Sequence, residues 1–422
     1  MPFSSLGLSS ALCAAAHSAG FQAPTPVQEA AIAAVLQGRD LLVRAQTGSG
    51  KTAAFALPLL QLVVPAAPSR GAPRRVQALV LVPTRELAVQ VGDVLKALAR
   101  ELTPAPKISV VFGGVSINPQ MMGLRGGSDI VVATPGRLLD LLDHNAVHLD
   151  QVRTLVLDEA DRLLEQGFSE ELGRIVGMLG AARQSLFFSA TFASPVSALA
   201  QQLLRDPVHV EVPDTTDTLP DIAQSAIAVD TRARTQLLRH LIKQYGWSRT
   251  LVFVATKYAA EIVADKLRKG GLNAEPLHGQ LSQGKRSQVL EDFKASRIAV
   301  VVATDLAARG IDVVELPVVV NYDLPRSADD YTHRIGRTGR AGQAGLAVSF
   351  VTADTEAHWR LIEKRQGLAL ELEAVEGFEP TEVAAVEAAR FVDPSGHGGV
   401  KGKRPSKKDK LRAAAASPVQ PD

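Results

Sequence analysis

Short, uninterrupted apolar runs recur along the chain and alternate with longer amphipathic stretches. Such unbroken runs are typical of strands that are buried on both faces of a parallel sheet. Helical stretches, among them residues 84–99 and 258–269, lie between the runs. Alternating strands and helices predict open α/β sheets with right-handed crossovers. The predicted strands are residues 41–45, 78–82, 108–112, 130–133, 155–157, 185–188, 251–254, 298–303, 318–321 and 346–351.

The alternation lapses once, between about residues 206 and 220, where prolines and short polar residues gather. Such a segment is typical of a linker. We therefore predict a first domain over residues 1–210, a linker over 211–221 and a second domain over 222–380, each domain a mostly parallel sheet flanked by helices. Residues 381–422 are expected to form a flexible tail, basic from about residue 401. We expect the two domains to share one architecture, although no clear sequence repeat relates them.

Composition narrows the class of protein. The chain has 422 residues, of which 46% are hydrophobic and 21% charged, as in ordinary globular proteins. One cysteine, Cys13, excludes an intrachain disulfide and a cysteine-rich zinc site. No Lys or Arg precedes Arg39, and prolines interrupt the uncharged stretch 53–69, so we expect neither a signal peptide nor a membrane span. We expect a cytoplasmic protein without a membrane partner.

The formal net charge of +2 hides an asymmetry. Residues 395–422 hold seven Lys or Arg and two acids, which leaves the rest of the chain at −3. A body of that charge needs a local cationic patch to bind a polyanion. The tail is either an electrostatic tether for a polyanion or a solubilising appendage.

A glycine-rich loop follows the run at 41–45 and precedes a helical stretch. Residues 45–52 read Ala-Gln-Thr-Gly-Ser-Gly-Lys-Thr, which departs from the usual phosphate-loop signature at Ala45. The glycines allow several backbone N–H groups to face one phosphate cluster. The alternative is a plain glycine-rich turn. The expected nucleotide contacts are Thr47, Gly48, Ser49, Gly50, Lys51 and Thr52, with Lys51 at the β- and γ-phosphates and the Thr52 hydroxyl on Mg²⁺.

Two carboxylates end the run at 155–157. Asp158 and Glu159 stand at the carboxyl end of a predicted strand, where open α/β sheets bind ligands. A strand that ends in acids is often a solvated turn. Downstream of a phosphate loop, the pair instead predicts an ATP site in which Asp158 holds Mg²⁺ through water and Glu159 activates the attacking water.

Basic residues cluster in the second domain. Arg337 and Arg340 lie three positions apart, so on one helical turn both guanidinium groups face the same way. A surface turn is the alternative. In a phosphate-loop enzyme, the negative charge that develops in the transition state must be stabilised. We predict that these two residues are arginine fingers, which the second domain supplies to the site in the first.

With these motifs in order, the chain resembles the DEAD-box ATP-dependent RNA helicases over about residues 3–380. The resemblance implies two RecA-like domains, ATP and Mg²⁺ as cofactors, RNA as the partner, and ATP hydrolysis that is coupled to local, non-processive unwinding or to remodelling of ribonucleoproteins. Residues 111–126 and the opening residues 3–8 most resemble the bacterial RhlE-type subgroup. Ribosome assembly and RNA degradation are the processes in which partners are expected, and we expect a monomer.

The resemblance also assigns roles to single residues. Gln28 would read the adenine edge and Phe3 would stack on the base, although without the resemblance Gln28 would be an exposed helix side chain and Phe3 a core residue. Gly310 would approach the γ-phosphate and Asp312 the ribose. Phe253 is expected to be mainly core packing. Ser189, Thr191, Asp161 and His333 would couple hydrolysis to strand separation. Predicted RNA contacts are Pro83, Arg85, Gly113, Gly114, Thr134, Pro135, Arg137, Gly279, Arg286 and Thr304.

Three other readings stay open at this point. A DNA helicase shares the phosphate loop and the arginine logic, and an RNA clamp would use ATP binding without unwinding. A small-molecule kinase is disfavoured because the arginine motif and the phosphate-contact loops would lack a purpose.

Overall fold

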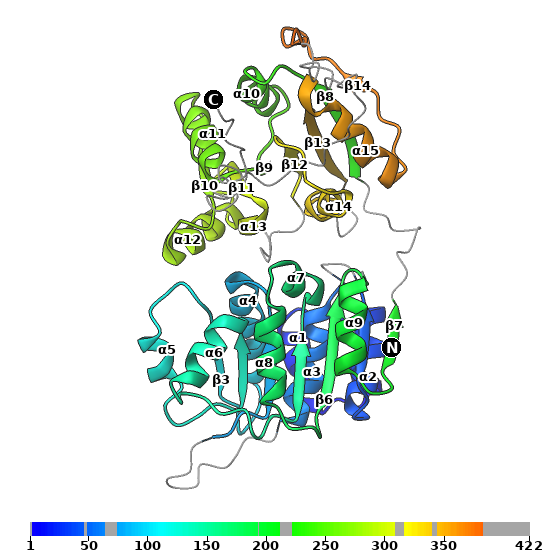
Figure 1. Cartoon of the computed structure of the whole chain (residues 1–422), viewed down its shortest axis with the longest axis vertical. Coiled ribbons are helices and arrows are strands. Elements are labelled where there is room, and N and C mark those ends of the chain that lie inside the picture. The colour runs from blue at the N-terminus through cyan, green and yellow to red at the C-terminus, as the bar shows by residue number, and fades with distance from the viewer. Residues whose placement is uncertain are drawn as a thin grey trace, which may run out of the picture.

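Two α/β domains make up the described part of the chain (Figure 1). The structure is a computed structural model that describes residues 2–45, 49–63, 74–192, 194–211, 222–308, 316–339 and 344–382. The last described strand of the first domain ends at residue 211, the first residue of the predicted linker, and the first described strand of the second domain begins at residue 222; residues 212–221 lie outside the described residues. Within the residues described, no helix is long and apolar enough to cross a membrane.

The first domain is built on a parallel sheet with the strand order β3-β4-β2-β5-β6-β1-β7. The apolar side chains of its inner strands are buried, as the unbroken runs predict. The strands are β1 (Leu41–Arg44), β2 (Ala78–Leu81), β3 (Ile108–Val111), β4 (Ile130–Ala133), β5 (Thr154–Leu157), β6 (Gln184–Ser189) and β7 (Val208–Glu211).

The second domain repeats this topology. Its parallel sheet has the order β10-β11-β9-β12-β13-β8-β14, which is the first order with each strand number raised by seven. The two domains therefore share one architecture without a visible sequence repeat. The strands are β8 (Ile222–Ala228), β9 (Thr250–Val254), β10 (Ala274–Leu277), β11 (Val300–Thr304), β12 (Val318–Asn321), β13 (Gly345–Val351) and β14 (Leu372–Glu373).

Helices cover both faces of the first sheet and form a separate apolar core on each. One core gathers side chains from α1 to α4, and the other gathers side chains from α6 to α9. The helices are η1 (Phe3–Leu6), α1 (Ser10–Ser18), α2 (Pro26–Leu36), α3 (Lys51–Leu62), α4 (Arg85–Ala99), α5 (Asn118–Gly123), α6 (Pro135–Asp143), α7 (Ala160–Glu165), α8 (Ser169–Gly177) and α9 (Ser194–Leu203).

The second sheet is covered in the same way. Helices α10 and α11 pack on one face, and the helices from α12 to α15 contribute to the cores on the other. Their bounds are α10 (Arg234–Gln244), α11 (Lys257–Lys269), α12 (Gln283–Lys294), α13 (Asp305–Ala308), α14 (Ala328–Ile335), η3 (Ala353–Thr355) and α15 (Glu356–Gln366).

Threonine caps determine where α4 and α11 begin, and the sequence predicts both starts to within one residue. The Thr84 hydroxyl accepts the N–H of Leu87 at 3.2 Å, and α4 begins one residue later. The Thr256 hydroxyl accepts the N–H of Ala259 at 3.0 Å, and α11 begins at Lys257. A capping hydroxyl satisfies a backbone donor that the first turn leaves unpaired.

Four strands escape the sequence pattern: β7, β8, β10 and β14. Three of them lie at sheet edges, and the fourth, β8, is only partly buried, carries Gln224 and Ser225 in its middle and pairs with the two-residue β14. An edge strand has a neighbour on one side only, so the sheet does not require a continuous apolar run there. Strand β10 even contains a proline, which an edge tolerates.

The predicted start of the flexible tail is wrong by at least two residues. Thr381 and Glu382 donate their backbone N–H groups to Asp230 at 2.8 Å each, and the Glu382 carboxylate accepts the N–H of Thr231 at 2.9 Å. These bonds attach the chain to the start of the second domain through residue 382. The basic part of the predicted tail lies outside the described residues.

Candidate nucleotide and nucleic-acid site

The phosphate loop joins β1 to α3. Gly50 has φ = 90°, a left-handed conformation that favours glycine, and α3 begins at Lys51. The buried Lys51 Nζ donates to the carbonyl of Ala45 at 2.6 Å, so the ammonium closes the loop on itself. Ser49 and Thr52 lie beside this turn, whereas Thr47 and Gly48 lie outside the described residues. The start of a long helix supplies the free N–H groups that a phosphate requires.

Gln28 is held by the phosphate loop rather than exposed. Its Oε1 accepts the N–H of Thr25 at 3.0 Å, which caps α2, and its Nε2 donates to the carbonyl of Gly50 at 3.1 Å. The side chain is 1% exposed. The alternative of an exposed helix side chain is therefore wrong. Contact with adenine stays a prediction, and in this structure the amide links α2 to the loop instead.

Phe3 lies in the apolar core of the first domain. It is 2% exposed and packs with side chains of α1 to α4. The structure therefore places its ring in the core, and stacking of Phe3 on a base stays a prediction. Phe253 is also buried, as expected. Gly310 and Asp312 lie outside the described residues.

The acidic pair follows β5 directly. Burial raises the pKa of Asp158 to about 7, and the neighbouring Lys51 ammonium counteracts part of that rise. Glu159 adopts φ = 50°, and its N–H donates to Asp158 Oδ1 at 3.0 Å. A positive φ at a residue other than glycine is a local strain that clusters at functional sites.

Hydrogen bonds join Asp161, in the first turn of α7, to the residues that follow β6. Asp161 Oδ2 accepts the N–H of Ala190 at 3.2 Å, and from Thr191 it accepts both the N–H, at 3.1 Å, and the hydroxyl, at 3.2 Å. The Ser189 hydroxyl donates to the carbonyl of Thr191 at 2.7 Å. Three of the predicted coupling residues thus form one network.

The residues present fit a magnesium ion. Glu159 Oε2 is a buried oxygen that accepts no hydrogen bond, although it lies 3.6 Å from Arg162 Nε, and Asp158 is a carboxyl whose charge burial disfavours. A further cation beside them would stabilise the charged form of Asp158. The described residues contain no group of three or more candidate metal ligands. Mg²⁺ is commonly bound by one or two carboxylates and by substrate phosphates. Thr52 and Asp158 would hold the ion, which would neutralise phosphate charge.

The predicted coupling residue His333 approaches the first domain. A small cavity is lined by Arg162 of the first domain and by His333, Arg334 and Arg337 of the second. Burial, reinforced by the Arg162 guanidinium, lowers the pKa of His333 to about 4, so the imidazole is neutral at pH 7. Arg337 is buried beside it, and Arg340 lies outside the described residues.

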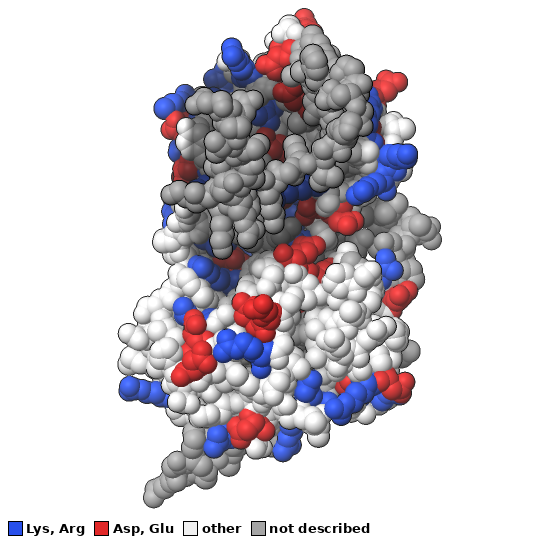
Figure 2. Space-filling view, viewed as in Figure 1, with Lys and Arg blue, Asp and Glu red and all other residues white. Residues whose placement is uncertain are grey.

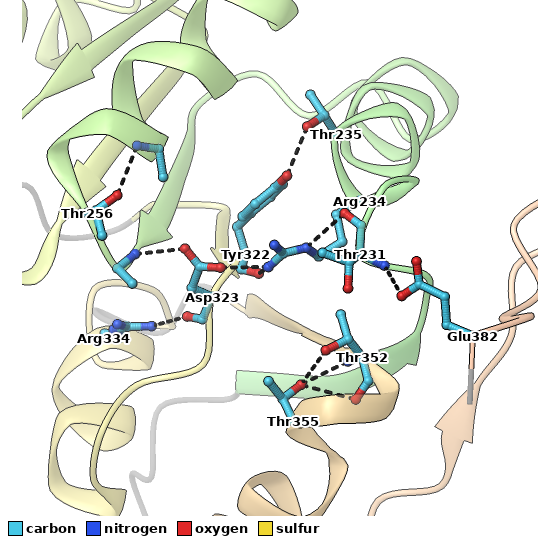
Figure 3. A network of polar contacts seen from close by, with 12 residues as sticks. Thr231, Arg234, Thr235, Thr256, Tyr322, Asp323, Arg334, Thr352, Thr355 and Glu382 are labelled. Carbon is cyan, nitrogen blue, oxygen red and sulfur yellow. Dashed lines mark hydrogen bonds and ion pairs between the residues drawn. The ribbon is translucent and has the colours of Figure 1, made fainter. Parts of the chain in front are cut away.

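Arg334 lies within the basic motif, but the sequence reasoning gave it no role. Its Nε and Nη2 donate to the two oxygens of Asp305 at 2.6 and 2.7 Å, and its Nη1 donates to Asn321 and to the carbonyl of Asp323. Figure 3 shows that Asp323 in turn accepts from Arg234 and from the backbone. Arg334 therefore ties α14 to the start of α13, to the end of β12 and to the loop that follows β12. Its place between His333 and Arg337 was the signal available in the sequence.

Eight of the ten predicted RNA contacts line one cavity of about 460 Å³ between the domains. The first domain contributes loops that follow β2, β3 and β4, and the second contributes the loop after β10 and the start of α12. Pro135 and Thr304 do not line it. Gln166, Phe168 and Leu306 do, although the sequence reasoning did not name them. We call this cavity the groove; the residues it shares with the prediction are Pro83, Arg85, Gly113, Gly114, Thr134, Arg137, Gly279 and Arg286.

An ion pair crosses the groove. Arg286 Nη2 of the second domain lies 3.0 Å from Glu86 Oε1 of the first, and the two side chains are 7% and 8% exposed. Gln283 Nε2 donates to the same oxygen at 3.4 Å. Burial lowers the pKa of Arg286, and the Glu86 carboxylate raises it in part. Glu86, which was not predicted as a site residue, therefore neutralises a predicted RNA contact.

Known families match this chain over both domains. The DEAD/DEAH box helicase family model matches residues 25–199, and the helicase conserved C-terminal domain matches residues 233–342. The chain is 40% identical to the DEAD-box ATP-dependent RNA helicase CshA of Bacillus cereus over 362 residues, which cover 86% of this chain and 67% of that protein. It is also 40% identical to the ATP-dependent rRNA helicase rrp3 of Emericella nidulans, over 86% of this chain and 76% of that protein.

Solved structures of RNA-bound proteins resemble this chain over both domains. Dbp5 of S. cerevisiae bound to RNA and ADP BeF3 superposes with a TM-score of 0.78 and 31% identity, over 88% of this chain and 95% of that one. Mss116p bound to ssRNA and AMP-PNP gives a TM-score of 0.77 at 28% identity, over 88% and 78%. The chain belongs to the DEAD-box family of ATP-dependent RNA helicases, with two RecA-like domains.

Proposed function

We propose that this chain hydrolyses ATP at the junction of its two domains and uses that reaction to separate short RNA duplexes locally. The observation that carries the proposal is the groove, because it gathers predicted RNA contacts from both domains of a chain whose first domain also holds the buried acids. Closure of the domains would complete both sites at once, so ATP and RNA should raise each other's affinity.

Each residue has a role that its position supports. Lys51 would leave the Ala45 carbonyl and bind the β- and γ-phosphates. Glu159 would accept a proton from the attacking water. Arg337 would stabilise negative charge in the transition state from the second domain. Asp161 and His333 would couple changes at the nucleotide site to the groove, through the residues at the end of β6.

Turnover of ATP by the full chain, with and without single-stranded RNA, tests the proposal. We expect RNA to stimulate turnover and a matched DNA to do so less, if contacts to the 2′-OH select RNA. Glu159→Gln should bind ATP but lose hydrolysis. Glu170→Gln, at an exposed position on α8, is the control and should keep both. Wild-type turnover by Glu159→Gln would contradict the assignment of the base.

Two further variants separate binding from chemistry. Lys51→Ala should lose nucleotide binding or turnover, because the loop would lack its cation. Arg337→Ala should spare ATP binding and abolish hydrolysis, whereas Arg174→Ala, on an exposed side chain of α8, should change neither. An unchanged kcat in Arg337→Ala would remove it as an arginine finger.

We further propose a place in the RhlE-type subgroup, supported by the sequence of residues 111–126. A monomer that acts in ribosome assembly or RNA degradation is the corresponding proposal for its biology. Size-exclusion chromatography with light scattering tests the monomer, and sequencing of crosslinked RNA tests the targets.

A further inference from the structure

Helices α10 and α11 run from the groove side of the second domain to its far side. Helix α10 joins the end of β8 to the start of β9, and α11 joins the end of β9 to the start of β10. In a parallel sheet such helices return antiparallel to the strands. Their first residues therefore lie at the carboxyl edge of the sheet, with the groove, and their last residues lie at the opposite edge.

Helix α11 contacts the rim of the groove directly. Gly279, which lines the groove, follows His278, and His278 Nε2 lies 2.7 Å from Glu261 Oε1 of α11. A strand of RNA that passes Gly279 would therefore leave the groove beside α11. At about 1.5 Å per residue, the 13 residues of α11 span roughly 20 Å from that rim.

Two cations converge where these helices end. Lys243 Nζ of α10 donates to the carbonyl of Gly270 at 2.9 Å. A Cβ at Gly270 would lie 2.5 Å from Arg239 Cδ, so the absence of a side chain there lets Arg239 pack against the end of α11. Lys266, Arg268 and Lys269 are exposed on the last turn of α11. Two nearby acids offset part of this charge: Asp265 pairs with Lys269 at 2.7 Å, and Glu275 Oε1 lies 4.0 Å from Arg268 Nη1.

Aromatic rings accompany the cations. A cavity of about 500 Å³ is lined by Arg239, Lys243, His240 and Phe378 together with Gln236 and Gln244, and the His240 and Phe378 rings lie 5.3 Å apart. Just past α10, the Tyr245 and Trp247 rings stack at 6.1 Å, with Tyr245 62% exposed. The lining of this cavity includes no acid among the residues described, although Glu376 and Glu379 flank Phe378 in the chain.

Charge is mixed elsewhere on the visible surface. Figure 2 shows Lys and Arg interspersed with Asp and Glu over the first domain. A local combination of cations and exposed rings is the pattern that proteins use to hold single-stranded nucleic acid, because cations meet the phosphates and rings stack on bases of any sequence.

We propose that Arg239, Lys243, Tyr245 and the last turn of α11, which we call the α10–α11 surface, bind single-stranded RNA that leaves the groove at Gly279. RNA is favoured over an acidic protein because the helix leads away from the RNA groove and because the rings suit bases. The surface lies outside the groove, so it would lengthen the bound strand without changing the ATP site.

The test compares two RNAs that share one core sequence: a short one that fills the groove and one extended at both ends. Their affinities for the full chain, with a non-hydrolysable ATP analogue, are measured by fluorescence anisotropy over a salt series. In Arg239→Glu/Lys243→Glu, the extended RNA should bind roughly tenfold more weakly and its salt slope should fall by about 1.4, since each lost contact to a single strand removes about 0.7. The short RNA should bind as it does to the wild type.

Three controls make the result specific. Arg239→Lys/Lys243→Arg keeps the charge and should bind the extended RNA normally. Lys96→Glu/Arg100→Glu changes the same charge on exposed positions of the first domain and should have no length-dependent effect. Tyr245→Ala should weaken binding of the extended RNA even at high salt, because stacking is not screened.

The result has two ways to overturn the proposal. If the extended RNA binds the charge-reversed variant as tightly as the control variant, RNA does not occupy the surface, and an acidic protein becomes the candidate. If short and extended RNA lose affinity equally, the effect belongs to the groove or to the fold. Basal ATP turnover without RNA should be unchanged and verifies folding.

Discussion

Glu86 and Arg286 hold the two domains together across the groove, and removing one of their charges should open the free protein. In Glu86→Gln the Arg286 guanidinium would stay 93% covered without its carboxylate. Loss of one member of a fully buried pair costs about 3–5 kcal/mol, because the remaining charge is desolvated and unpaired. Here the domains can separate and let water reach Arg286, so the cost should appear as opening of the domains.

The expected shift is about 1–3 kcal/mol in the closed-to-open equilibrium, or roughly 5–150-fold. Gln283 donates to the same Glu86 oxygen and would lose part of its bond as well. Single-molecule energy transfer between one dye in each domain, without nucleotide or RNA, measures the populations directly. Glu275→Gln is a matched control, because Glu275 forms its 3.1 Å pair with Lys285 inside the second domain.

The charge swap Glu86→Arg/Arg286→Glu restores an ion pair with its two charges exchanged. It should recover part of the closed population if the pair itself is responsible. Equal opening in Glu86→Gln and Glu275→Gln, or no opening in either, would refute the reasoning. Arg286→Gln should both open the domains and weaken RNA binding, because Arg286 is also a predicted RNA contact.

Three other expectations follow from local chemistry. The pKa of His333 is lowered to about 4, so between pH 6.5 and 4 the unfolded chain binds more protons than the folded chain. As the pH falls over that range, the free energy of unfolding should decrease by about 3 kcal/mol relative to His333→Gln, measured by urea titration. The pKa of Asp158 is raised to about 7, so its buried charge destabilises the folded protein above that pH. Asp158→Asn should therefore stabilise the free protein by at most about 4 kcal/mol at pH 8, and this stabilisation should disappear near pH 4. Identical melting of both proteins at pH 8 would contradict this expectation. Gly114 has φ = 76° and a Cβ there would overlap the Arg85 guanidinium, so Gly114→Ala should weaken RNA binding and leave ATP binding intact. The control Gly173→Ala, at an exposed position of α8 where a Cβ meets open space, should change neither.

Short-range patterns were enough to predict the inner strands, the start of α3 at the phosphate loop and the acids at the end of β5. These features depend on burial and on hydrogen bonds between residues that are close in the chain, and both leave a periodic or local signal. The edge strands β7 and β10 left no such signal, because a strand with one neighbour does not need an unbroken apolar run.

Contacts between distant segments required the tertiary structure. Nothing near Glu86 in the chain indicates that it meets Arg286, and nothing near Arg334 indicates its bidentate bond to Asp305. The orientation of Gln28 toward Gly50 and the burial of Phe3 likewise depend on how α2 and η1 pack against α3. A motif specifies which chemical groups are available. Which of them meet depends on how helices and domains dock, because docking is determined by the summed packing of many side chains rather than by any local pattern.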